Sequence, residues 1–120
     1  MFRDLIKKIV EGCEGGLAGL LMGFDGIAVD SYAVANAESD IQSVGMEFSV
    51  ILTQARNAVS LLGGGGLREV AFKSEKMTVI IRLLNDEYFL ALALTPDGNY
   101  GKGRYLLRST APSILAELTS

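Results

Sequence analysis

Hydrophobic positions recur at helical spacing at the start of the chain and then gather into short runs that are typical of strands. An N-terminal helix is predicted by Phe2, Leu5, Ile6, Ile9 and Cys13. The runs 17–23 and 27–33 predict two strands. Between them, Asp25-Gly26 is a strong signal for a two-residue hairpin turn, which would place Phe24 and Ile27 opposite each other at the strand ends.

Residues 39–62 form the longest periodic segment of the chain. One continuous apolar stripe runs along it, made of Ile41, Val44, Phe48, Ile51, Leu52, Ala55, Val59 and Leu62. A stripe of this kind normally packs on a core. We therefore expect one long helix that lies on a sheet.

The second half of the chain predicts three more strands and a last helix. The strands are 67–74, 77–84 and 88–95, and the short polar segments between them suit hairpins. The last two strands are apolar at nearly every position, which is typical of strands covered on both faces. After a turn-rich segment, residues 101–118 predict a helix in which Pro112 should cause a kink or delay the start.

This order of elements predicts an α/β (α+β) fold. The simplest assembly is a single domain over residues 1–120, with a five-stranded antiparallel sheet. The long helix would cover one face and the two terminal helices the other. The last two strands would then be buried between the helical layers, as their composition requires.

Composition narrows the class of protein. Hydrophobic residues make up 49% and charged residues 21% of the chain, as in ordinary globular proteins. The net charge of −3 gives no basic footprint for nucleic acid. No run approaches the ~20 apolar residues that a membrane span needs, and the N-terminus lacks a signal-peptide core. We expect a cytoplasmic protein that binds neither nucleic acid nor membrane.

The sequence LLGGGGLREV at residues 61–70 could suggest a phosphate-binding loop. Such loops run from a strand into the N-terminus of a helix, where backbone N–H groups and the helix dipole meet the phosphate. Here the glycines follow a helix and precede a strand, and Leu67-Arg68 stands where a Lys-Ser/Thr pair would be needed. The glycines are therefore better interpreted as a helix stop followed by a loose connection to the next strand.

No catalytic set is found. The chain has no histidine, which removes His-based triads, His-ligated metals and the usual general base. Cys13 is the only cysteine and lies on an apolar stripe, so we interpret it as a buried small hydrophobe. Carboxylates that could pair lie mostly in predicted turns, namely Asp25, Asp86, Glu87 and Asp97. We expect a non-enzyme with no catalytic residues, metal or cofactor.

Arg56 and Arg82 could in principle act as arginine fingers. Arg82, however, interrupts an apolar strand, where a long side chain more often reaches past the edge of the sheet.

Two groups of residues are not explained by packing in a hydrophobic core. Met46, Val50, Thr53 and Asn57 form a second stripe on the long helix, opposite the core stripe, where a solvated face would carry charges. This favours a contact surface. At the hairpin tip, Phe24 and Ile27 could either anchor a partner or pack under a terminal helix, and the sequence leaves both interpretations open.

The chain resembles the roadblock/LC7 family. Three segments carry the resemblance: LLMGFDGIAVDSY looks like the family's first hairpin, LTQARNAVSLLGGGG like its second helix and exit, and VIIRLLNDEYFLALALTPDGNYGKGRYLLR like its closing hairpin and last helix. The resemblance covers almost the whole chain. The short form with MGFDGI is similar to the bacterial branch, which includes cell-polarity regulators of gliding bacteria.

The resemblance implies a dimeric platform for Ras-like small GTPases. Such domains join their sheets through an edge strand and pack their central helices side by side. An unpaired edge strand is also a template for pairing. We expect a homodimer interface made of Met46, Val50, Thr53, Asn57, Glu69, Ala71 and Lys73. We expect partner binding at Phe24, Asp25 and Ile27.

The function expected is that of an adaptor that binds another roadblock protein or a small GTPase, in bacterial cell polarity and motility. One alternative is a roadblock protein that activates GTP hydrolysis directly. Another is a small-molecule sensor domain, which would need polar groups inside the apolar strands. Thr78 and Arg82 are the only obvious candidates for such groups.

Overall fold

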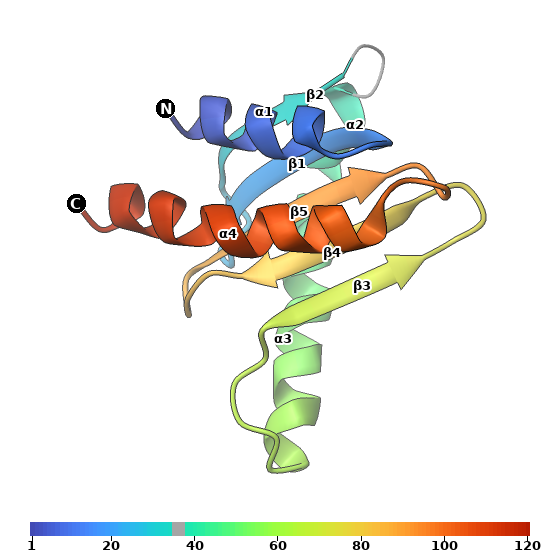
Figure 1. Ribbon diagram of the computed structural model, residues 1–120. Helices are drawn as coiled ribbons and strands as arrows, with labels where there is room; N and C mark the ends of the chain where they lie inside the picture. The colour runs from blue at the N-terminus through green and yellow to red at the C-terminus, as the bar shows by residue number, and fades with distance from the viewer. Residues whose placement is uncertain (35–37) are drawn as a thin grey trace.

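An antiparallel sheet of five strands forms the middle layer of the protein (Figure 1). The computed structural model describes residues 1–34 and 38–120, apart from the side chains of 38–40. The strands are β1 (Gly16–Gly23), β2 (Ala28–Ala33), β3 (Glu69–Lys73), β4 (Thr78–Leu83) and β5 (Tyr88–Leu94), in the order β2-β1-β5-β4-β3. The predicted fold class is confirmed, since helices cover both faces of this sheet.

Helices α1 (Phe2–Gly12) and α4 (Tyr100–Leu118) lie side by side on one face (Figure 1). Their apolar residues pack with Leu21 of β1, Ile80 of β4 and Leu92 of β5 in one buried cluster. α4 begins where Asn99 Oδ1 accepts a hydrogen bond from the Lys102 N–H at 3.0 Å. Pro112 does not delay this start, because the helix is already formed from Tyr100 and continues through the proline.

The opposite face carries α2 (Glu38–Ser43) and α3 (Gly45–Leu61). The prediction of one helix over 39–62 was wrong at its beginning, because the helix is interrupted at Val44. Gly45 approaches β1 so closely that an added Cβ would lie 2.3 Å from Met22 Cε. The break therefore lies where the helical layer is in close contact with the sheet.

Only the first part of α3 rests on the core. Phe48 and Leu52 are buried against β1, β4 and β5, whereas Leu61 is 90% and Leu62 84% exposed. Figure 1 shows the C-terminal part of α3 extending beyond the sheet, past β3. The expectation that the whole apolar stripe is covered was wrong, because the helix is longer than the sheet that it crosses.

The β1–β2 connection is a three-residue loop and not the predicted two-residue turn. The Gly26 N–H donates to the Gly23 carbonyl, and the Gly23 N–H donates to the Ile27 carbonyl, both at 3.0 Å. Gly26 has a φ of +86°, which gives the left-handed residue that closes a three-residue hairpin loop. Ile27 is consequently opposite Gly23, and Phe24 lies within the loop.

The glycine run ends α3, as predicted. The Gly63 N–H donates to the Ser60 carbonyl at 3.0 Å and the Gly64 N–H to the Val59 carbonyl at 2.9 Å. Gly63 has a φ of +69°, a common conformation just after a helix.

Candidate functional site

The hairpin loop is held against the fold by Phe24. This half-buried ring makes an edge-on contact with Phe89 of β5, with 5.4 Å between the ring centroids. The Arg56 guanidinium of α3 lies 3.9 Å from the Phe24 ring centroid. The backbone is held as well, because Phe24 N–H donates to the Glu87 carbonyl (2.9 Å) and the Ser49 hydroxyl donates to the Phe24 carbonyl (2.8 Å).

The other two residues predicted to bind a partner have different surroundings. Ile27 is 67% exposed. Asp25 is exposed, and its Oδ1 accepts a hydrogen bond from the Ile27 N–H at 3.0 Å, so it also stabilises the loop. Of the three residues, Ile27 is the one whose apolar side chain is largely exposed.

The hairpin loop and the predicted dimer helix meet at Met46. A Cβ added to Gly26 would lie 2.0 Å from Met46 Sδ, so the methionine packs on the loop. Met46 is nevertheless 56% exposed, and Val50, one turn further along α3, is 54% exposed. Together with Ile27 these side chains give a bare apolar surface, which we call the loop–helix surface.

All four residues of the predicted helical stripe are exposed. Beyond Met46 and Val50, this holds for Thr53 and Asn57. The Thr53 hydroxyl donates to the Ser49 carbonyl of its own helix at 2.9 Å. The position of the stripe is as expected, and its role as an interface stays a prediction.

The predicted interface residues of β3 lie on the other side of the sheet from that stripe. Glu69 Oε2 accepts from Arg104 Nε of α4 at 2.6 Å, and Lys73 Nζ lies 4.4 Å from the ring centroid of Tyr100 on α4. Val70 and Phe72 instead pack toward α3. β3 pairs only with β4 among the described residues, so its outer edge is open.

Sequence reasoning missed an apolar groove between α3 and the β3–β4 hairpin. It has a volume of about 230 Å³ and is lined by Phe48, Ile51, Phe72, Ser74, Met77 and Val79. Ile51 and Met77 are exposed there. The period-2 alternation of Val70 and Phe72 was the available signal, because it places both on one face of the strand.

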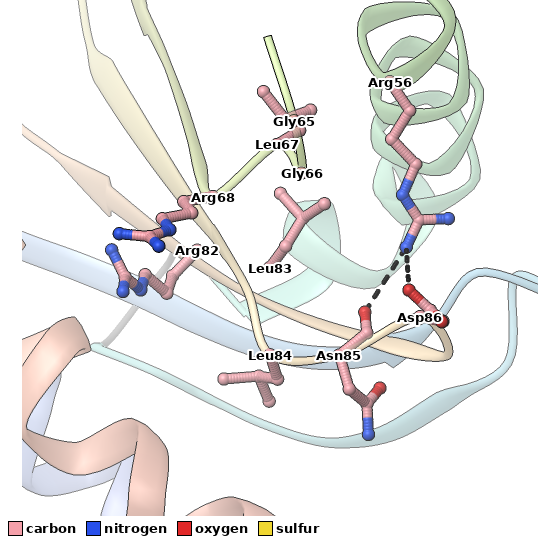
Figure 2. A pocket seen from close by; sticks show the side chains of 10 residues that line it. All are labelled: Arg56, Gly65, Gly66, Leu67, Arg68, Arg82, Leu83, Leu84, Asn85 and Asp86. Carbon is pink, nitrogen blue, oxygen red and sulfur yellow. Dashed lines mark hydrogen bonds and ion pairs between the residues drawn. The ribbon is translucent and has the colours of Figure 1, made fainter. Parts of the chain in front are cut away.

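A larger and more polar cleft lies beside the glycine run. Its volume is about 520 Å³, and its lining residues are Arg56, Gly65, Gly66, Leu67, Arg68, Arg82, Leu83, Leu84, Asn85 and Asp86. Figure 2 shows the Arg56 guanidinium on one side and those of Arg68 and Arg82 on the other, with Leu83 between them. We call this the arginine cleft. Arg82 does not reach past a sheet edge, because β4 is an inner strand, and it pairs with Glu69 of β3 at 3.9 Å.

The side chains considered for other chemistry do not assemble into a site. Cys13 is buried, its thiol donates to the Asn99 carbonyl at 3.3 Å, and burial raises its pKa. Thr78 and Arg82 lie at opposite ends of β4, about 13 Å apart along the strand. Within the described ranges, no group of three or more His, Cys, Asp or Glu side chains could hold a metal ion.

In the described part of the chain, no helix is both long enough and apolar enough to cross a bilayer, and this includes the long helix α4.

The chain is 47% identical to MglC from Myxococcus xanthus, over 97% of this chain and 98% of that one, with a TM-score of 0.69. It has the same fold as a roadblock/LC7 domain from Streptomyces avermitilis, with 15% identity over 97% of this chain and 96% of that one and a TM-score of 0.87. The chain belongs to the roadblock/LC7 family.

A third similar structure is that of an MglB with tetrameric arrangement. It is 14% identical over 92% of this chain and 82% of that one, with a TM-score of 0.82. No family model matches the sequence, and no curated protein matches it either.

Proposed function

We propose that this protein is a non-catalytic, dimeric adaptor of a Ras-like small-GTPase system, which binds a second roadblock protein and acts in bacterial cell polarity and gliding motility. The 47% identity to MglC supports the assignment to this branch of the family. A fold neighbour from Thermus thermophilus is itself named a gliding protein. The observation that carries the proposal is the bare apolar surface along α3.

The homodimer would bury apolar side chains of α3 that are exposed in the isolated chain. Val50, Leu61 and Leu62 present large apolar side chains on a helix that extends beyond its own sheet. Each such side chain contributes roughly 1.5–3 kcal/mol when it is fully buried. The open edge of β3 lies at the same side of the molecule and can add backbone hydrogen bonds to a second copy.

The contact set of this dimer is larger than the sequence predicted. Beside Met46, Val50, Thr53 and Asn57, it includes Val70 and Phe72, because these face α3. Glu69, Ala71 and Lys73 would contribute through the backbone of β3 and at the rim on the α4 side.

The second roadblock protein would bind at the loop–helix surface, with Ile27 as the apolar contact and Asp25 as a charge at the rim. Rim charges act on the rate of association more than on affinity. Direct activation of GTP hydrolysis has less support from the two arginines that the sequence singled out, because Arg56 lies over Phe24 and Arg82 is directed toward Glu69. The exposed Arg68 is not held in this way. An arginine finger needs a guanidinium that is free to enter another protein's site.

The test uses the purified chain with the roadblock protein and the Ras-like GTPase of its own bacterium. Titration calorimetry should show binding to the roadblock protein, and Ile27→Ala should weaken it at least tenfold. Ser113→Ala, on the exposed surface of α4, is the matched control and should bind as the wild type does. Addition of the chain to the GTP-loaded GTPase alone should leave the hydrolysis rate unchanged. A clear acceleration would replace the adaptor with a direct activator.

A further inference from the structure

Apart from Arg56, which also lies over Phe24, the residues of the arginine cleft have no role in the proposed dimer or at the hairpin loop, yet the cleft concentrates positive charge. Three of the 11 Lys and Arg residues of a chain with net charge −3 line it. They come from three different elements: Arg56 from α3, Arg68 from the segment before β3, and Arg82 from β4. A local cluster of this kind in an acidic protein gives a site that attracts anions.

The acids of the chain neutralise these arginines only loosely. Arg56 Nη2 is 4.0 Å from Asp86 Oδ1, and the Asp86 side chain is fully exposed. Arg82 is 3.9 Å from Glu69, but the same carboxylate is bound much more closely by Arg104, at 2.6 Å. Arg68 is exposed, and the described part of the chain provides no ion pair for it. Arg56 Nη2 also donates to the Asn85 carbonyl at 3.3 Å, so the donors left for an incoming anion are the other nitrogens of Arg56 and the guanidinium of Arg68.

Besides the arginines, Asn85 and Asp86, the cleft is lined by leucines and glycines. Leu67, Leu83 and Leu84 form part of its lining. A Cβ added at Gly66 would meet no atom within 4 Å, and the same is true at Gly65. The glycine run therefore leaves one rim of the cleft open to a ligand that carries apolar groups beside its charge.

The surroundings favour carboxylates over phosphate. The glycine run follows the C-terminus of α3, where the negative end of the helix dipole opposes any anion, and opposes a doubly charged phosphate more than a singly charged carboxylate. The arginines already face the carboxylates of Asp86 and Glu69 at long range, which stronger carboxylate contacts could replace. Arginine binds carboxylates through two parallel hydrogen bonds, and such pairs are among the stronger ones in proteins.

We infer that the arginine cleft binds an acidic segment of a partner protein, with its carboxylates on Arg56 and Arg68 and its apolar side chains against Leu67 and Leu83. Asp86 lines both this cleft and a smaller one beside Phe24 and Asp25. The segment would thus lie next to the loop–helix surface, as a second contact that goes beyond the proposed function.

The experiment measures binding of a fluorescein-labelled six-residue peptide of alternating Glu and Leu to the full chain, by fluorescence anisotropy. The matched peptide carries Gln in place of Glu. The wild-type chain should bind the acidic peptide saturably, and Arg68→Gln should weaken binding about tenfold, as expected for loss of a charge-assisted contact. Lys76→Gln, which removes an exposed charge from the β3–β4 turn, should have little effect. Binding should also weaken at high salt.

Several results would overturn the inference. These are no saturable binding, equal binding of the Gln peptide, or no effect of Arg68→Gln. Displacement of the peptide by pyrophosphate at lower concentration than by glutarate would make this a phosphate site instead. Dissociation of the wild-type dimer by Arg68→Gln, seen by light scattering, would show that a second copy fills the cleft. The proposed function is tested separately, through Ile27 and Val50, which lie outside the cleft.

Discussion

The guanidinium carbon of Arg56 lies 3.9 Å from the centroid of the Phe24 ring. This contact joins the middle of α3 to the loop between β1 and β2. Ser49 and Met46 of the same helix also contact this loop. A change in the position of α3 on dimerisation would therefore reach the residues that we expect to bind a partner.

Phe24→Ala should lower the free energy of unfolding by roughly 2–3 kcal/mol. The estimate lies below the ~3–5 kcal/mol of fully buried Phe→Ala changes because the ring is half-buried. Urea denaturation of this variant and of Ile27→Ala makes the comparison, since the exposed Ile27 should change stability by less than about 0.5 kcal/mol. Equal stability of Phe24→Ala and wild type would mean that the ring serves recognition alone.

Val50→Glu should convert the dimer to a folded monomer. An unpaired charge buried at an interface costs roughly 3 kcal/mol or more, whereas in the monomer this side chain meets water. Static light scattering at micromolar concentration, with circular dichroism as the check on folding, decides the matter. Ser113→Glu adds the same charge on the exposed surface of α4 and should leave the dimer intact. A monomeric wild type would contradict the proposed interface.

Gly63→Ala and Gly66→Ala should differ in stability although both positions are open. Neither added Cβ would meet an atom within 4 Å, but Gly63 has a φ of +69°. A left-handed conformation costs a non-glycine residue roughly 1–2 kcal/mol. Gly66→Ala should be neutral or slightly stabilising. Thermal unfolding of the pair separates backbone conformation from packing, and identical melting temperatures would refute this account.

The Cys13 thiol should make stability fall at alkaline pH. Burial, with a smaller contribution from Glu14, raises its pKa above the ordinary value of 9.0. The folded state therefore keeps a proton that the unfolded chain loses, so the stabilisation is complete below about pH 9 and is lost as pH rises through the folded pKa. Wild type should lose stability relative to Cys13→Ala above about pH 9. A pH-independent difference would show that the thiol titrates normally.

Most elements of the fold could be predicted because each has its own local spacing of hydrophobic residues. The strands and the terminal helices follow from residues that are close in sequence. The break at Val44 could not be predicted in this way, since it depends on how closely Gly45 approaches Met22 of β1. The uncovered end of α3 was missed for a related reason, because a periodic stripe does not reveal where the sheet beneath it ends.

The surfaces were harder to predict than the elements. Both a two-residue and a three-residue hairpin use a glycine at the position of Gly26, so local sequence left the place of Phe24 undecided. The arginine cleft joins residues 12 to 26 positions apart, from three elements. No spacing rule brings Arg56, Arg68 and Arg82 together before the sheet order is known.

The central strand of the sheet, β5, pairs with a strand from the other end of the chain. β1 ends at Gly23, whereas β5, its partner along residues 16–23, begins only at Tyr88. During synthesis, β1 leaves the ribosome long before β5, its pairing partner, exists. Closure of such a distant pair is slow, and the exposed strands invite aggregation in the meantime. Release of a chain truncated before residue 88 should therefore yield insoluble material. The order of translation thus requires that β1 stays protected from aggregation until β5 has been made.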